Sequence, residues 1–170
     1  MRRLSPLVML LALGLVGLNL RPAVTSVGPL LVEITQSLGL SGAQARILQT
    51  LPAICFGLAG PLAPMLGRRF GAENVIFLAI IALAAGCGMR FFESAPVLYL
   101  SCLVAGLAIG AMNVLLPGIV KRDFPERVGA VTGFYTMVLC LGAAGASALA
   151  PQVERIFGTA WPSALAVWGL

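Results

Sequence analysis

Long apolar stretches separated by short polar ones dominate this sequence. A bilayer core about 30 Å thick needs roughly 20 mostly apolar residues per helix, so the stretches can be divided by that length. Five of them are long enough to span, whereas a sixth stretch begins near Thr159 and is too short before Leu170 to cross. The pattern therefore predicts an all-α, polytopic bundle of transmembrane helices. The expected bounds are 4–32, 47–66, 75–92, 96–120 and 128–150, with a partial helix at 159–170.

The composition supports a membrane protein. Hydrophobic residues make up 59% of the 170 residues and charged residues 10%, and the mean hydropathy is +1.01. A soluble protein of this size would need more polar surface, so lipid must supply part of the surroundings. The 20 Gly and 11 Pro interrupt apolar stretches, as is common in transmembrane helices.

The positions of lysine and arginine predict the orientation in the membrane, because short loops rich in them stay in the cytoplasm. With the N-terminus inside, seven basic residues fall on the inner side and three on the outer side. A cytoplasmic N-terminus is therefore expected. The inner residues are Arg2, Arg3, Arg68, Arg69, Lys121, Arg122 and Arg127, and the outer ones are Arg46, Arg90 and Arg155.

The N-terminus also has the outline of a cleaved secretory signal, because Met-Arg-Arg precedes an apolar stretch from Leu7 to Leu18. The polar sequence NLRPAVTS that follows has no clear small-x-small cleavage pattern, and the later apolar stretches span the membrane in either case. A retained first helix is the simpler interpretation.

Arg21 is the basic residue inside the first apolar stretch, where a charge costs at least about 2.5 to 3.5 kcal/mol. Pro22 removes a backbone hydrogen bond from the same turn, and Asn19 adds another polar side chain. Because a guanidinium group presents a planar fork of donors, these residues predict a clamp for an anion or a carbonyl group. Alternatively, the helix ends at Leu20 and Arg21 extends to the outer headgroups.

Further polar side chains lie within the apolar spans, some of them shortly before a proline. Each is explained by ordinary hydrogen bonding between helices. As a set they suggest a solute site, because transporters place their sites where helices are broken near the middle of the membrane. The candidates are Gln49, with Thr50, ahead of Pro52, Asn113 ahead of Pro117, and Tyr135 beside Thr136.

Nothing in the sequence indicates an enzyme or a cofactor. There is no histidine, no GxSxG motif and no phosphate-binding loop. The four cysteines lie in apolar stretches without a CxxC pair, which argues against a metal site or a disulfide framework. The net charge of +5 is divided into small groups between apolar stretches, which is not typical of nucleic-acid binding.

Pairs of glycines at four-residue spacing predict close helix contacts. These pairs are Gly106 with Gly110 and Gly129 with Gly133. They also support an alternative function, a non-transporting membrane module that associates with other helices.

The stretches NLRPAVTSVGPLL, QTLPAICFGLAGPLAP, NVLLPGIVKRDFPERVGAVTGFYTM and WPSALAVWGL cover much of the chain. In order and spacing they resemble the cyanate and nitroimidazole transporter branch of the major facilitator superfamily. The resemblance implies a bacterial inner-membrane protein with two six-helix halves, between which a solute is moved by alternating access. It also implies that Arg21 and Asn19, which match NLRP, face the central cavity.

The loop after the second predicted helix departs from the superfamily pattern, in which an aspartate and an arginine precede a glycine and more basic residues. Arg69 and Gly71 fit that pattern, but Arg68 occupies the acidic position and Glu73 follows the glycine. Two interpretations of these charges remain. They gate the inner side by pairing with acidic residues of the next inner loop, or they are solvated and only set the topology. The gating candidates are Arg68, Arg69, Gly71, Asp123 and Glu126.

The chain is shorter than the resemblance implies, since 170 residues supply about half the helices at roughly 20 residues per span. We therefore expect the N-terminal half of a transporter, incomplete within its sixth helix and unable to transport alone. Its expected partners are the missing C-terminal six-helix half, the lipid bilayer and a small anionic or polar organic solute.

Overall fold

The computed structural model is all-helical within the residues that it describes, which are 6–20, 25, 27–92 and 94–157. The predicted all-α bundle is thereby confirmed. Its elements are α1 (Pro6–Leu20), α3 (Val27–Ser37), α4 (Gly42–Phe70), α5 (Ala72–Gly88), a 3₁₀ turn η1 (Met89–Phe91), α6 (Ala95–Asp123) and α7 (Val128–Phe157).

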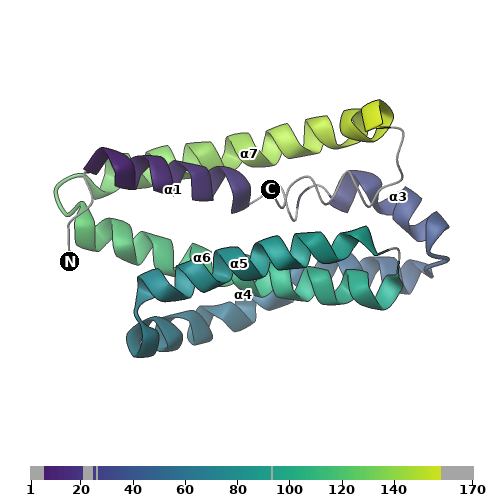
Figure 1. Cartoon of the computed structure of the whole chain (residues 1–170), viewed down its shortest axis with the longest axis horizontal. Coiled ribbons are helices and arrows are strands. Elements are labelled where there is room, and N and C mark those ends of the chain that lie inside the picture. The colour runs from purple at the N-terminus through teal and green to yellow at the C-terminus, as the bar shows by residue number, and fades with distance from the viewer. Residues whose placement is uncertain (1–5, 21–24, 26, 93, 158–170) are drawn as a thin grey trace.

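Among the described residues, four helical segments are long and apolar enough to cross a membrane by length and composition. They run in alternating directions along the long axis of the bundle (Figure 1). This arrangement is the one expected for the N-terminal half of a major facilitator fold. The segments are Gly42–Phe70, Ala72–Phe91, Ala95–Asp123 and Val128–Leu149.

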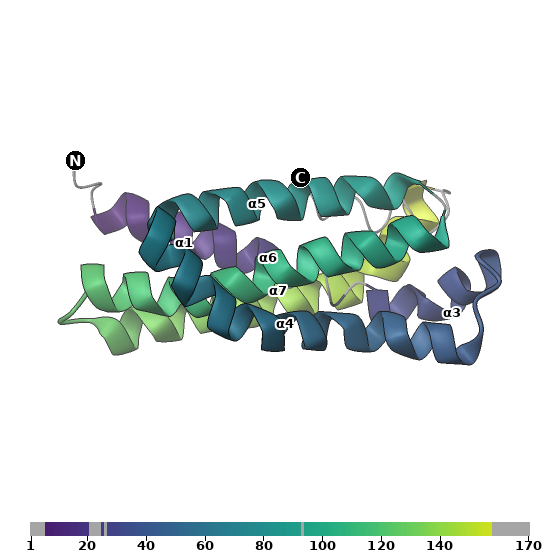
Figure 2. The same cartoon turned by 90° about the horizontal axis from the view of Figure 1, so that it is seen from below.

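Helix α6 is the centre of the bundle. It packs against both α4 and α5, whereas α1 packs along α7 on the other side of the molecule (Figures 1 and 2). In the most apolar 18-residue stretch of each helix, 56% of the residues are buried in α6, compared with 17% in α4 and 22% in α7. Helices α4 and α7 therefore present most of their apolar side chains outward, to lipid or to further helices.

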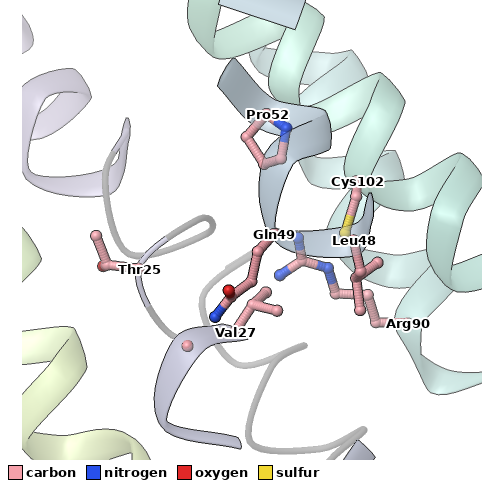
Figure 3. A pocket seen from close by; sticks show the side chains of 8 residues that line it. Thr25, Val27, Leu48, Gln49, Pro52, Arg90 and Cys102 are labelled. Atoms are coloured by element: carbon pink, nitrogen blue, oxygen red, sulfur yellow. The ribbon is translucent and has the colours of Figure 1, made fainter. Parts of the chain in front are cut away.

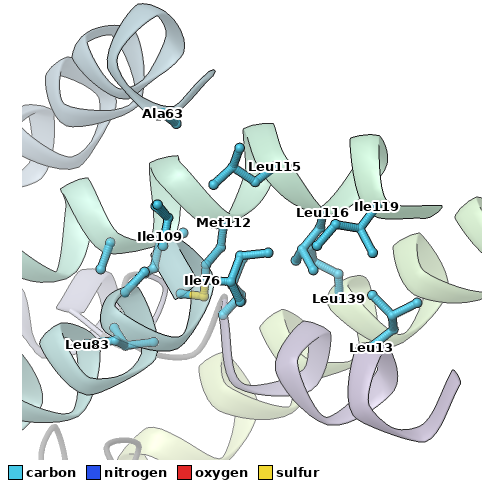
Figure 4. Packing of buried hydrophobic residues seen from close by; sticks show 14 of the residues in the cluster. Leu13, Ala63, Ile76, Leu83, Ile109, Met112, Leu115, Leu116, Ile119 and Leu139 are labelled. Carbon is cyan, nitrogen blue, oxygen red and sulfur yellow. The ribbon is translucent and has the colours of Figure 1, made fainter. Parts of the chain in front are cut away.

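Two apolar clusters hold the helices together. The larger one joins α1, α5, α6 and α7, with Ala63 of α4, around Met112, Ile109 and Leu116 (Figure 4). The smaller one joins α3 to the beginnings of α4 and α6 through Ile34, Leu48 and other residues.

Helix α4 extends beyond the predicted bounds of 47–66 because single residues fix its two ends. Helix α4 begins before Ile47 because Ser41 and Gln44 form a reciprocal capping box, in which the Gln44 amide donates to Ser41 Oγ over 3.3 Å. It ends at Gly71, whose φ of 87° favours glycine. Apolar length alone cannot locate such ends.

The remaining bounds differ in both directions, since α5 ends at Gly88, before the expected end at Phe92. The fifth predicted helix continues through the polar sequence after Ala150 to Phe157. The first predicted segment contains α1 and α3 and extends to Ser37, past the expected end at Val32. The expected break at Arg21 and Pro22 and the partial helix at 159–170 lie outside the described residues.

Glycines do permit close helix contacts, but only some of the predicted ones. A Cβ added at Gly106 would lie 2.9 Å from Cβ of Cys55, and one at Gly110 would lie 2.6 Å from Cβ of Ala59, so both allow α6 to approach α4. A Cβ at Gly129 or Gly133 would meet nothing within 4 Å. The predicted close contact is therefore confirmed for the first pair, whereas the second pair has no such contact among the described residues and stays a prediction.

Candidate solute site

Two of the predicted solute residues meet in the structure. The hydroxyl of Tyr135 on α7 donates to Oδ1 of Asn113 on α6 over 3.4 Å. Tyr135 is only 7% exposed, so this pair lies in the interior of the bundle. At a rise of 1.5 Å per residue, Asn113 is roughly 15 Å from the end of α6 at Asp123, about half the thickness of a bilayer core.

The ring of Tyr135 reaches this position because α1 has a glycine opposite it. A Cβ at Gly17 would lie 3.1 Å from Cδ2 of Tyr135. Two further close approaches hold the same helices together: Gly14 faces the ring of Phe134, and Gly142 lies against the backbone carbonyl of Leu18. The α1–α7 contact thus holds the polar pair beside the first helix.

Gln49 lies at a separate feature, a pocket of about 320 Å³ between α3, α4, η1 and α6 (Figure 3). Gln49 lies roughly 10 Å along α4 from Gly42, the first residue of that candidate membrane span. Neither Asn113 nor Tyr135 is among the described residues that line this pocket. Those residues are Thr25, Val27, Gly28, Leu48, Gln49, Pro52, Arg90 and Cys102.

Arg90, which the sequence pattern places among the outer topology charges, is a further polar residue of this pocket. It is 1% exposed and lines the pocket, so it is not a solvated loop charge. Its Nε donates to Oγ of Ser101 over 3.3 Å, and Ser101 in turn donates to the carbonyl of Leu98 over 3.0 Å. The buried Nη1 of Arg90 has no hydrogen-bond partner in the described structure. A sequence signal did exist, because Met89, Phe91 and Phe92 surround this arginine with apolar side chains.

Arg21, the leading solute candidate, lies outside the described residues, and so does the side chain of Asn19 in the last turn of α1. The clamp that they are expected to form stays a prediction. Thr50, by contrast, donates to the backbone carbonyl of Arg46 in its own helix over 2.8 Å. This bond satisfies its hydroxyl without any solute.

The gating candidates lie at the opposite end of the bundle. There Arg122, which was not among these candidates, pairs with acidic residues. Nη2 of Arg122 lies 2.7 Å from Oε1 of Glu73, and Nε of Arg122 lies 2.8 Å from Oδ1 of Asp123. The first pair joins the start of α5 to the end of α6.

The suggested pairing of Arg68 or Arg69 with Asp123 or Glu126 does not occur among the described residues. Instead, the guanidinium carbon of Arg69 lies 5.3 Å from the ring centroid of Phe70. Both arginines are exposed at the end of α4. Glu126 is exposed in the loop between α6 and α7. The sequence could not separate Arg122 from Arg68 and Arg69, since all three fall in inner-side basic groups.

The arrangement offers hydrogen-bond donors and one buried positive charge in an otherwise apolar bundle. Such groups can bind an anion or a polar solute by charge and hydrogen bonding.

Comparison with known proteins places this arrangement in context. A family model described as Major Facilitator Superfamily matches residues 8–170. The chain is 37% identical to the 2-nitroimidazole transporter of Escherichia coli (strain K12) over 94% of its own length and 40% of that protein. It is 32% identical to the cyanate transport protein CynX of the same organism over 95% of its own length and 42% of that protein.

An uncharacterised transporter of Bacillus subtilis (strain 168), YycB, is 34% identical over 91% of this chain and 38% of that protein. The chain therefore spans about two-fifths of the length of these relatives. The family resemblance inferred from the sequence motifs is confirmed by these matches.

Proposed function

Because the chain belongs to the major facilitator superfamily, we propose that it forms part of a secondary transporter for a small anionic or polar organic solute. Two of its relatives are named as transporters of 2-nitroimidazole and of cyanate, and this supports a solute of that size and polarity. The family is one of transporters and not of enzymes. The bacterial inner membrane, with the N-terminus in the cytoplasm, is the location that we propose.

The observation that carries the proposal is the Asn113–Tyr135 pair. Polar side chains inside an apolar membrane bundle are candidates for function. The depth that we propose for this pair, near the middle of the membrane, is where transporters bind their solutes. We propose Asn113 and Tyr135 as solute ligands on one side of the cavity, together with Arg21 and Asn19 of the first helix. Gln49, which lines the pocket beside Arg90, is a further candidate.

We also propose that a further helical half completes the transporter. The chain spans about two-fifths of its relatives. The outward apolar faces of α4 and α7, with exposed Phe56, Met65, Met137 and Leu141, are suited to further helices or lipid. Alternating access requires two bodies that move against each other, so one of them alone is expected to be inactive.

The experiment is solute flux into proteoliposomes, with cyanate and 2-nitroimidazole as probes. The 170-residue chain is compared with the protein extended to its natural stop codon. Flux in the extended form alone supports both the solute class and the need for a second half. Flux in the short chain contradicts the second point, and no flux of either probe in folded, extended protein contradicts the solute class.

The alternative, a non-transporting module that associates through glycine pairs, is favoured by one observation. Gly129 and Gly133 have open space around them and stay available for an outside helix, whereas Gly106 and Gly110 are already used by α4. A polar pair between α6 and α7 has no purpose in that alternative beyond helix contact. The flux measurement above decides between the two functions.

A further inference from the structure

We propose that the pocket around Arg90 is a binding site for a small organic monoanion, such as a carboxylate with an apolar body, and that Arg90 recognises its charge. This inference rests on the proposed function, since a site at this end of the bundle would bind the solute before or after its passage. Arg90 was not among the solute residues expected from the sequence. Its role is argued from burial, hydrogen bonding and the chemistry of the pocket wall.

The first step is the state of the guanidinium group. Arg90 is 1% exposed, and Ser101 is its hydrogen-bond acceptor through Nε. That bond fixes the side chain and leaves the buried Nη1 without a partner. Buried arginines are normally paired, because an uncompensated charge in an apolar surrounding is strongly unfavourable. An arginine that is bound to Ser101 through Nε alone can donate its remaining N–H groups to a ligand oxygen.

The second step is the direction of that donor. Figure 3 shows the guanidinium group of Arg90 extending toward Gln49, from the α5–η1 end of the bundle to the wall formed by α4. The Gln49 side chain carries both a donor and an acceptor. Arg90 and Gln49 therefore offer donors from two helices to one ligand head group.

The third step is the rest of the wall. None of the described lining residues is acidic, so no described side chain of the wall neutralises Arg90. Apart from Thr25, Gln49 and Arg90, the wall consists of Val27, Gly28, Leu48, Pro52 and Cys102. One cation in an apolar wall fits a singly charged ligand with an apolar body. A volume of about 320 Å³ is at the lower end of the range for small-molecule sites, roughly 300 to 1,000 Å³.

The test measures binding and not transport, so its outcome is separate from that of the flux experiment. The protein extended to its natural stop codon is purified in detergent, and radiolabelled benzoate is the probe in equilibrium dialysis. Benzamide is the neutral comparison because it has nearly the same shape. Saturable binding of benzoate, with benzamide binding at least about tenfold more weakly, is expected if a charge is recognised.

Variants then assign the site. Arg90→Gln is expected to weaken benzoate binding about tenfold to a hundredfold, the loss typical of a hydrogen bond to a charged group. Arg46→Gln is the matched control, because Arg46 is exposed on α4 near the same end and does not line the pocket. It should leave benzoate affinity unchanged. The proposal is overturned if both variants weaken benzoate binding equally, or if neither variant weakens it.

A second pair of variants covers the case in which Arg90→Gln fails to fold. Gly28 lines the pocket and a Cβ there would meet nothing within 4 Å, so Gly28→Leu introduces bulk without a backbone clash. Gly57→Leu on α4 is its control, since Gly57 also has open space and does not line the pocket. Loss of benzoate binding in Gly28→Leu but not in Gly57→Leu supports the site. Absence of benzoate binding to the unaltered protein at millimolar concentration refutes it, whatever the flux experiment shows.

Discussion

The hydroxyl of Tyr135 lies 3.4 Å from the amide oxygen of Asn113 and joins α7 to α6, two helices that otherwise have few contacts with each other. A bond of this kind between membrane helices is worth on average only about 0.6 kcal/mol, so it contributes little to holding the bundle together. The pair therefore remains a proposed solute site and is not a main support of the fold.

Replacing Tyr135 by Phe tests that interpretation. The apolar ring remains against Gly17, so the melting temperature should fall only slightly, while the KM for the transported solute should rise about twofold to tenfold through loss of one hydrogen bond. Tyr99→Phe is the control, because the Tyr99 hydroxyl donates to the backbone carbonyl of Gln44 over 2.9 Å, away from the pair. The same KM change in both variants would remove Tyr135 from the solute site.

Substitution of Gly110 should separate the central helices. In Gly110→Ala the new methyl group would lie 2.6 Å from Cβ of Ala59, so α4 and α6 must move apart, at a cost of about 1 to 3 kcal/mol. Gly133→Ala adds the same methyl group in open space and should be neutral or slightly stabilising. Thermal unfolding in detergent compares the two. Equal melting temperatures would show that the α4–α6 approach is looser than described.

The ion pair of Arg122 with Glu73 should matter little for stability, and only at low salt. Their side chains are 55% and 63% exposed, and exposed pairs are generally worth less than about 1 kcal/mol. Arg122→Gln is expected to lower the melting temperature slightly at low ionic strength and not at 1 M salt, where the Debye length is about 3 Å. Arg68→Gln should show no such salt dependence. A salt-independent loss of transport in Arg122→Gln would instead indicate gating by this arginine.

The proposed orientation can be tested by labelling single cysteines in intact cells. The background variant is Cys140→Ser, since Cys55, Cys87 and Cys102 are buried. Gly42→Cys, at the start of α4, should react with a membrane-impermeant maleimide from outside. Glu126→Cys, in the loop between α6 and α7, should react only after the cells are permeabilised. The reverse pattern would mean that the basic residues mark the outer side.

The spans were predictable from the sequence because the bilayer dictates the length of an apolar helix, and this requirement does not depend on tertiary contacts. The helix ends were less predictable because they depend on individual groups such as the Ser41–Gln44 capping box and the positive φ of Gly71. The glycines that contact a neighbouring helix could not be separated from those that do not, for a similar reason. Gly110 and Gly133 look alike in sequence, but only the rotation of each helix about its axis decides which one faces a neighbour.

The candidate site was predictable in part. Polar residues in apolar spans identified Asn113, Tyr135 and Gln49, because polarity at membrane depth is unusual in any arrangement. Their division between an interior pair and a pocket depends on helix packing, which the sequence pattern does not contain. Arg90 was missed because an arginine at the end of an apolar stretch is normally a loop charge. In the structure it is buried, and its Nε donates to Ser101 on the next helix.

The pairing of α1 with α7 has a consequence for how the protein is made. The backbone of α1 at Leu18 fits against Gly142, and Gly17 fits against Tyr135, yet nearly the whole described chain separates these contacts in sequence. At a synthesis rate of about 5 to 20 residues per second, α1 leaves the ribosome on the order of ten seconds before α7. During that interval the first helix lacks the contacts that α7 provides, so its position in the bundle is fixed only late in synthesis.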